Sequence, residues 1–346
     1  MTKVLLGVNA FPATGDGGRR QAEALATWRA LDGVRLANLG WPGDVFEVDG
    51  FATHAVLARD SRTASGQQGP RKPIVSEAFD RLAEIAEAEG CRWFAYANSD
   101  IAFTQAAIDR ILGGGRDAYA FSRMDVHPET GEGIEMVTAG IDAFAISAGW
   151  WRANRRRFRA YIGGEPIWDN VYTAILLRHA DAELLNREPL VTHERHPAGD
   201  WRRSPFARYL NYLAALDRPY FSLWAEYHAR LEDLRAGRSR ERSEPPSLPQ
   251  SVLGEGQPRS GRERATPGEA GEGLVGGRER ALPAGLSEGS TKSAELGTTP
   301  AGVSEDEEMR LQRIFRRRRG PLAHTLQAGR ALKARVRWAA AKRGDA

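Results

Sequence analysis

The sequence predicts an α/β fold with a Rossmann-like, mainly parallel sheet flanked by helices, and three observations lead to this prediction. The chain has 346 residues, of which 41% are hydrophobic, so it can bury a sizeable core. Up to residue 237, short apolar runs alternate with stretches in which apolar residues recur every three or four positions. Helices of this length between strands act as crossovers, which make neighbouring strands parallel.

The predicted elements follow one another along the first 237 residues. The clearest helix opens with Pro73 and closes at Gly90, and its apolar residues share one face. The other helices and strands are predicted from the same kinds of pattern. In chain order, strands are expected at 3–11, 34–41, 53–58, 92–97 and 117–125, and helices at 19–31, 73–90 and 104–115.

Composition changes sharply near Gly237. Residues 238–305 contain no Phe, Trp, Tyr or His and are dominated by Gly, Pro, Ser, Glu and Arg. Such a stretch cannot bury enough apolar surface to offset the entropy lost on ordering, which predicts a disordered linker. We therefore expect a folded domain at 1–237, the linker at 238–305 and a basic helical tail at 306–346.

Charge is distributed unevenly along the chain. Residues 306–346 contain twelve Lys or Arg and four Asp or Glu, a net of +8, while the whole chain carries +4, which leaves −4 for residues 1–305. The folded part therefore has no general attraction for nucleic acid. The tail could bind an anionic membrane surface or an acidic polymer, or it could be a solvated extension.

The cysteine count and the start of the chain bear on location. Cys91 is the single cysteine and cannot form an internal disulfide. Neither a leader segment at the N-terminus nor a long uncharged apolar run is apparent. We expect a cytoplasmic protein, attached peripherally to the inner membrane surface if the tail binds it.

The apolar strand at 92–97 runs directly into Asn98, Ser99 and Asp100. In an open parallel sheet, ligands bind beyond the carboxyl ends of the strands, which is where these residues would lie. A carboxylate there can hold a hard cation through oxygen, and the cation can hold a diphosphate. The alternative is an ordinary turn in which Asn98 and Asp100 cap the next helix.

Two further carboxylates, those of Asp142 and Asp169, also lie next to apolar runs. In residues 136–147, Gly140 would let the backbone approach a ligand, and Asp142 could meet an acceptor hydroxyl; a bulged strand would also explain them. Asp169 follows Trp168 at the start of a predicted helix. An aromatic ring suits a sugar face, and the carboxylate could deprotonate a hydroxyl. Otherwise Asp169 would be a helix cap or a first-turn acid with a stabilising role.

Histidine and arginine side chains add two more candidates. His193 and His196 lie three apart after an apparent strand, so both can reach one site. No cysteine set accompanies them, which argues against structural zinc, but one histidine could join Asp100 around Mn²⁺ or Mg²⁺; both could instead be packing residues. Arg19 could hold a phosphate or the edge of a uracil-type base, or begin a solvated helix. The sequence has no GxxxxGK[ST] loop, GxSxG elbow or GxGxxG after a strand.

Together these segments resemble the nucleotide-diphospho-sugar transferases of the GT-A type, within a glycosyltransferase-like family. The likeness rests on YANSD, GIDAFAIS, IGGEPIWDN and THERH in that order, and it covers about residues 1–215. In this family an Asp-X-Asp motif holds the metal and the donor diphosphate. The matching tripeptide here is Asn98-Ser99-Asp100, in which Asn replaces the first acid.

The resemblance implies a hexosyltransferase-like enzyme that moves a sugar from a nucleotide-diphospho-sugar to an acceptor hydroxyl with the help of Mn²⁺ or Mg²⁺. It implies that Asp100 carries the metal, that His193 or His196 completes the metal site and that Asn98 contacts ribose or sugar.

The resemblance also implies roles for the two later carboxylates. Asp142 would lie in the donor-sugar or acceptor pocket, and Asp169 would be the base of an inverting reaction. If Asp169 is only a cap, a retaining route is equally open.

Two other functions remain open at this point. Because Asn98 replaces an acid, the chain could be a non-catalytic module that binds a nucleotide sugar or glycan on a degenerate GT-A fold. A nucleotidyltransferase would need a Gly-rich, Arg- or Lys-bearing loop directly after the first strand, and residues 9–21 offer only a loose version of it.

Overall fold

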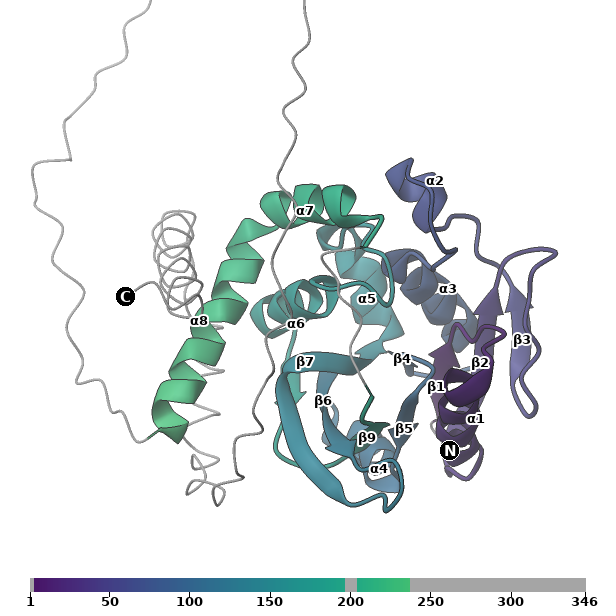
Figure 1. Cartoon of the computed structure of the whole chain (residues 1–346), viewed down its shortest axis with the longest axis horizontal. Helices are drawn as coiled ribbons and strands as arrows, with labels where there is room; N and C mark the ends of the chain where they lie inside the picture. Colours follow the sequence, from purple (N-terminus) through teal and green to yellow (C-terminus); the bar gives the residue numbers. More distant parts are fainter. Residues whose placement is uncertain (1–2, 197–203, 237–346) are drawn as a thin grey trace, which may run out of the picture.

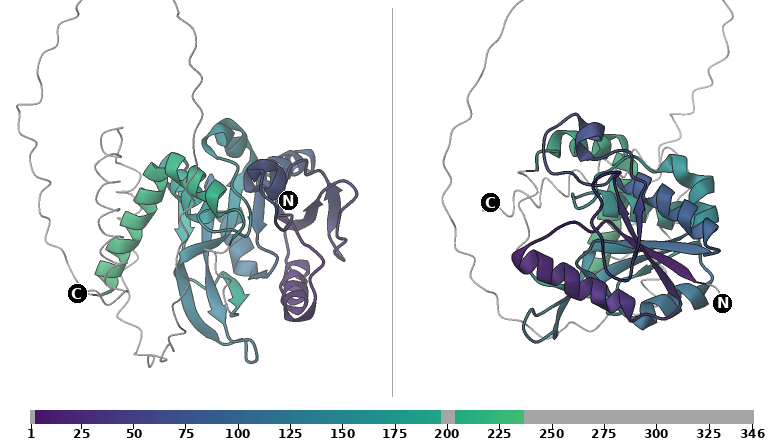
Figure 2. Two further views of the ribbon diagram at one scale, coloured as in Figure 1. Left: turned by 45° about the horizontal axis from the view of Figure 1, so that its top comes forward. Right: turned by 90° about the vertical axis from the view of Figure 1, so that its right-hand side faces the viewer.

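The computed structural model describes residues 3–196 and 204–236, which form a twisted sheet with helices on both faces (Figure 1; Figure 2). The expected linker at 238–305 and basic tail at 306–346 lie outside the described residues, as does Gly237. Among the helices that are described, none is both long and apolar enough to cross a membrane.

The sheet has nine strands in the order β3-β2-β1-β4-β7-β6-β9-β5, with β8 paired to β6. Five of its eight strand pairings are parallel, which confirms the mainly parallel sheet. The strands are β1 (Val4–Val8), β2 (Val34–Gly40), β3 (Ala52–Ala55), β4 (Trp93–Ala97), β5 (Ile101–Phe103), β6 (Ala118–Val126), β7 (Gly133–Ser147), β8 (Ala182–Leu185) and β9 (Val191–Glu194).

Helices cover the two faces of the sheet and bury a separate core on each. The larger core joins α3, α5, α6, α7 and α8 to one face, and the smaller core joins α1 and α4 to the other. The helices are α1 (Gly15–Arg29), α2 (Ser61–Ser65), α3 (Val75–Ala88), α4 (Gln105–Gly114), α5 (Ala148–Asn154), α6 (Trp168–His179), α7 (Ala207–Leu216) and α8 (Arg218–Arg235), with a 3₁₀ turn at Arg155–Arg157.

The elements expected from periodicity are present, with shifted ends. The helix expected at 19–31 begins earlier, at Gly15. This start was missed because the first turn is glycine-rich and has no apolar repeat. The strand expected at 3–11 covers only Val4–Val8. Elements such as β5, β8 and α2 were not predicted, since three to five residues are too few to show a period.

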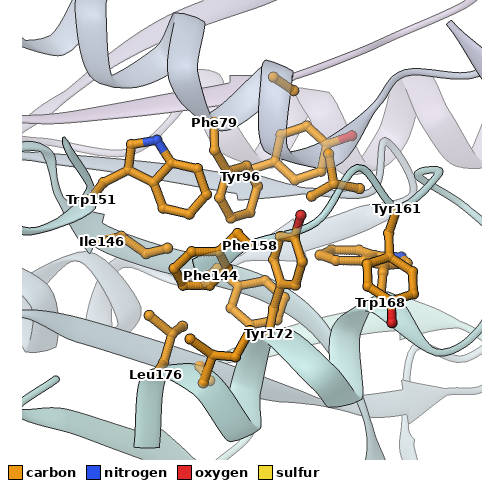
Figure 3. Packing of buried hydrophobic residues seen from close by; sticks show 14 of the residues in the cluster. Phe79, Tyr96, Phe144, Ile146, Trp151, Phe158, Tyr161, Trp168, Tyr172 and Leu176 are labelled. Carbon is orange, nitrogen blue, oxygen red and sulfur yellow. The ribbon is translucent and has the colours of Figure 1, made fainter. Parts of the chain in front are cut away.

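An aromatic cluster centred on Phe79 of α3 fixes the start of α6 against the sheet (Figure 3). The ring of Trp168 lies 6.5 Å from that of Phe79, centre to centre, and 5.3 Å from that of Phe144 on β7. The first contact is edge-to-face and the second is tilted, and aromatic contacts of this kind add to the burial of large apolar surfaces. Because Trp168 is held on two sides, the position of the next residue, Asp169, is determined by the core.

Candidate active site

The strand order places a topological switch point at the carboxyl ends of β1 and β4. β1 pairs in parallel with β2 on one side and with β4 on the other. The chain adds β2 and β3 on one side of β1 and then continues with β4 on the opposite side. Ligands of open α/β sheets bind at such a point, outside the carboxyl ends of the strands. The segment that leaves β4 at this edge is Asn98-Ser99-Asp100.

Asn98, Ser99 and Asp100 form a tight turn between β4 and β5, and all three are partly exposed. The backbone N–H of Ile101 donates to the carbonyl oxygen of Asn98 at 3.2 Å. The next helix, α4, is capped by Thr104, whose hydroxyl accepts from the backbone N–H of Ala107. Asp100 therefore has no part in capping α4, and its carboxylate is free for another role.

Sheet register brings His193 to the same place. β9 lies between β5 and β6, and His193 stands opposite Ile101 on one neighbour and Asp125 on the other. Because Asp100 directly precedes Ile101, its Oδ2 lies 3.5 Å from Nε2 of His193. His196 completes the group, with its Nε2 3.1 Å from Nε2 of His193 and 3.6 Å from Oδ2 of Asp100.

These three atoms have the spacing of ligands around one ion. Two ligand atoms that are each about 2.1 Å from an ion lie about 3.0 Å apart at a right angle and about 3.4 Å apart at a tetrahedral angle. Asp100, His193 and His196 offer one carboxylate and two imidazoles at 3.1–3.6 Å from one another. Their side chains therefore fit a divalent cation.

The carboxylate of Asp100 is held in its ionised form. Burial alone would raise the pKa of Asp100, but the hydrogen bond to His193 and the electrostatic influence of His193 and His196 lower it below its ordinary value. An ionised carboxylate is the form that binds a cation.

A chain of buried polar contacts leads away from His193. Nδ1 of His193 lies 3.1 Å from Oδ1 of Asp125, and Nε of Arg123 donates to the same oxygen at 2.7 Å. Another guanidinium nitrogen of Arg123 donates to Oδ1 of Asp142 at 2.9 Å. One arginine thus joins two buried carboxylates.

Asp142 lies within a bulge, as one interpretation of the sequence expected. Phe121 of β6 pairs with Ala143 and the next residue, Ser122, pairs with Ile141, so Asp142 has no partner on the neighbouring strand. Bulges of this kind redirect side chains next to functional sites. Asp142 is buried, and none of the described residues donates a hydrogen bond to its Oδ2. Burial raises the pKa of Asp142 despite the neighbouring Arg123.

Asp169 sits in the first turn of α6, beside the bulge. Its Oδ2 accepts hydrogen bonds from the backbone N–H of Ile141 at 3.3 Å and from Nδ2 of Asn170 at 3.2 Å. Burial, followed by the charge of Asp142, raises its pKa to about 7. Part of the surface of the Asp169 residue is exposed.

The entry to α6 is strained. Ile167, which precedes the helix, has φ of +89° and ψ of −42°, a region that a β-branched residue rarely adopts. Strain of this kind persists where surrounding structure fixes the backbone, and it occurs often at functional sites. Here Trp168, held by the aromatic cluster, supplies that constraint.

Arg19 lies beside β9, where its guanidinium faces the carboxylate of Glu194. Its guanidinium contacts both carboxylate oxygens of Glu194, at 2.8 Å and 2.5 Å, and also Oε2 of Glu23 at 2.8 Å. The structure thus brings Arg19 next to the residue that follows His193. Its suggested contact with a phosphate or a base stays a prediction.

Sequence reasoning missed Asp125, Arg123 and Glu194. Arg123 and Asp125 are two apart on β6 and so share a face of the strand, which was the available signal. That signal gains meaning only when the register of β6 and β9 places Asp125 opposite His193.

Comparison with known proteins gives distant structural matches. No protein-family model matches the chain, and no curated protein matches its sequence. The chain is similar to the crystal structure of S. aureus TarS 1–349 in complex with UDP-GlcNAc, at 11% identity and a TM-score of 0.42, over 64% of this chain and 71% of that one.

Two further solved structures are described as glycosyltransferases. GlyE of Streptococcus pneumoniae TIGR4 matches at 10% identity and a TM-score of 0.31, over 64% of this chain and 63% of that one. A glycosyltransferase involved in glycosylation of the major capsid of PBCV-1 matches at 10% identity and a TM-score of 0.27, over 55% and 93%. At these values the likeness is distant, so the function of this chain has to be inferred from its own side chains.

Proposed function

We propose that the chain is a glycosyltransferase that moves a sugar from a nucleotide-diphospho-sugar to an acceptor hydroxyl with the help of a divalent cation. One observation carries the proposal. A three-residue ligand set and a carboxylate with a pKa near 7 lie at one edge of the sheet; contacts lead from His193 through Asp125 and Arg123 to Asp142, whose charge acts on Asp169. Leaving-group stabilisation and proton removal are the two tasks of this reaction, and each half of the site suits one of them.

Asp100, His193 and His196 would hold the cation. One carboxylate oxygen and two imidazole nitrogens suit Mn²⁺, and Mg²⁺ is the usual alternative where oxygen ligands dominate. A bound cation supplies positive charge that neutralises a leaving diphosphate. Asn98 and Ser99, which are partly exposed in the same turn, would contact the ribose or sugar of the donor.

Asp169 would accept the proton of the acceptor hydroxyl as its oxygen attacks the sugar. A carboxylate with a pKa near 7 is a stronger base than an ordinary aspartate, yet a large fraction of it is ionised at neutral pH. A base on the acceptor side favours attack opposite the leaving diphosphate, so we propose inversion at the anomeric carbon.

Asp142 would bind rather than transfer a proton. Its Oδ1 is taken by Arg123, while its buried Oδ2 receives no hydrogen bond from the described residues. An unpaired buried carboxylate oxygen is costly, and a hydroxyl of a bound sugar would satisfy it.

A second function is favoured by Asn98. With only one acid in the turn, the site could bind a nucleotide sugar or glycan without turnover. Such a module would bind donor equally well when Asp169 is replaced by Asn, and it would release no nucleoside diphosphate.

A thermal-shift screen of the full chain tests the binding half of the proposal. UDP, UDP-GlcNAc, UDP-glucose and GDP-mannose would be added with Mn²⁺ or with EDTA, and the screen repeated on Asp100→Ala. A ligand that binds the folded state raises the melting temperature by mass action. We expect a cation-dependent rise for one nucleotide class that disappears in Asp100→Ala. Failure of every nucleotide to raise the melting temperature would remove the proposal.

A further inference from the structure

The pairing of two strands places Asp125 beside His193, one of the three candidate metal ligands. β6 and β9 pair in parallel, and the register sets Asp125 opposite His193. Both side chains are buried, with 6% of each residue's surface exposed. Their contact therefore does not depend on mobile surface side chains.

The contact with Asp125 favours the tautomer of His193 that can bind a cation. Oδ1 of Asp125 lies 3.1 Å from Nδ1 of His193 and can accept a hydrogen bond from this nitrogen when a cation occupies Nε2. In a neutral imidazole the other nitrogen then has a free lone pair. That nitrogen, Nε2, is the one that lies toward Asp100 and His196.

Arg123 holds Asp125 in place. Its Nε donates to Oδ1 of Asp125 at 2.7 Å, the same oxygen that faces His193. The rest of its guanidinium is anchored by Asp142, at 2.9 Å, so the arginine cannot turn away without leaving one carboxylate unpaired. Since both carboxylates are buried, such a loss would be costly.

We propose that Asp125 is a positioning residue of the metal centre, which keeps His193 in the tautomer and orientation that bind a cation, and that Arg123 holds Asp125 for this task. The inference rests on the proposed function only in requiring that Asp100, His193 and His196 bind a cation. Partners of metal-binding histidines are known to raise the affinity of a site in this way.

Asp80 provides a matched control elsewhere in the fold. Its Oδ1 also accepts from an aromatic ring N–H and from an arginine, namely Nε1 of Trp151 at 2.9 Å and Nε of Arg155 at 2.5 Å. It lies on α3, which packs on the larger core, and has no contact with the ligand set. Replacing Asp80 disturbs the same kind of arrangement without touching the metal centre.

The first measurement uses the full wild-type chain saturated with Mg²⁺, a diamagnetic cation that leaves the histidine spectra observable. Long-range ¹⁵N–¹H correlation spectra, assigned with His193→Gln, report which ring nitrogen is protonated. We expect the Nδ1–H tautomer for His193. An Nε2–H tautomer would overturn the inference without any variant of Asp125.

The second measurement is calorimetric titration with Mn²⁺ alone. We expect Asp125→Ala and Asp125→Asn to bind Mn²⁺ about 10- to 100-fold more weakly than wild type, and Arg123→Lys to show a smaller loss. Asp80→Asn should bind as wild type does. In Asp125→Ala the His193 spectrum should also gain Nε2–H signal.

The outcomes separate the two proposals. Wild-type affinity in a folded Asp125→Asn or Asp125→Ala variant overturns the positioning role alone. If wild type itself binds no Mn²⁺, the metal centre of the proposed function fails and the positioning role fails with it. Equal losses in the Asp125 variants and in Asp80→Asn would mean a general effect on the fold, which also overturns the inference.

Discussion

Nε2 of His193 lies 3.1 Å from Nε2 of His196, although the two residues are three apart in sequence. In an extended strand, side chains three apart point to opposite faces and are separated by about 10 Å. The close approach is possible because β9 ends at Glu194, so His196 lies beyond the extended strand. Two imidazole nitrogens facing each other beside a carboxylate are readily explained by a shared cation.

Replacing His196 tests that explanation. We expect His196→Ala to weaken Mn²⁺ binding about tenfold or more, because one of three ligands is removed while the other two stay in the sheet and its adjoining turn. Electron paramagnetic resonance of free Mn²⁺ during titration measures the affinity directly.

His127 serves as the control for this variant. It is an exposed histidine just after β6, and its Nδ1 accepts from the backbone N–H of Glu129. His127→Ala should bind Mn²⁺ as wild type does. Unchanged affinity in His196→Ala would show that the two histidines form a packing pair instead.

The pKa of Asp169 predicts how the rate depends on pH. If its carboxylate removes the acceptor proton, kcat/KM rises with pH up to about 7 and is level above it, because only the ionised form acts as a base. Asp169→Asn should lower kcat by about 100- to 10,000-fold and lose this rise. The same pH profile in Asp169→Asn would assign the ionisation to another group.

Replacing Asp169 is also predicted to raise the free energy of unfolding. Its folded pKa of about 7 lies above the ordinary aspartate value of 3.8, so the folded state binds more protons between these pH values and its stability falls as pH rises through them. The interval corresponds to at most about 4 kcal/mol. Asp169→Asn should therefore raise the free energy of unfolding at pH 8 and have little effect at pH 4.

Urea denaturation at both pH values measures this difference. If Asp169→Asn were only as stable as wild type at pH 8, the raised pKa of Asp169 would be contradicted. Wild-type levels of nucleotide binding would show that the substitution leaves the donor site intact.

A pair of glycines tests the packing of the fold. A Cβ on Gly7 of β1 would lie 2.2 Å from Cδ2 of Leu82 on α3, in the buried core. Gly7→Ala should therefore destabilise the protein by about 1–3 kcal/mol through overpacking. At Gly17 in the first turn of α1, the nearest atom to a Cβ is 3.9 Å away, so Gly17→Ala should stabilise it by about 0.5–1 kcal/mol. Equal effects at the two positions, measured by chemical denaturation, would contradict the contact between β1 and α3.

The sequence predicted the parts of the site that follow from local pattern. Asn98, Ser99 and Asp100 were expected at the carboxyl edge of the sheet because the apolar run of β4 ends just before them. The expectation that His193 or His196 meets Asp100 also agrees with their arrangement in the fold. The position of the Asn98–Asp100 turn needs only the end of one strand and the rule for where ligands bind, whereas the meeting of His193 with Asp100 depends on the pairing of β9 with β5.

Long-range register explains what could not be predicted. Asp125 and Arg123 gain their roles because β9 inserts between β5 and β6, and no local pattern gives the pairing of strands so far apart in sequence. The antiparallel direction of β7 could not be predicted for the same reason. The strained backbone of Ile167 likewise depends on the packing of Trp168, which only the folded core determines.

The most direct test of the central claim is release of nucleoside diphosphate by the full chain. The donor that raises the melting temperature would be incubated with Mn²⁺ or EDTA and with water or a mixture of simple sugars as acceptor, using wild type, Asp100→Ala and Asp169→Asn. We predict release that requires Mn²⁺ in wild type, is abolished in Asp100→Ala and is strongly reduced in Asp169→Asn. Equal release by all three proteins, or binding of donor with no release under any condition, would contradict a metal-assisted glycosyltransferase.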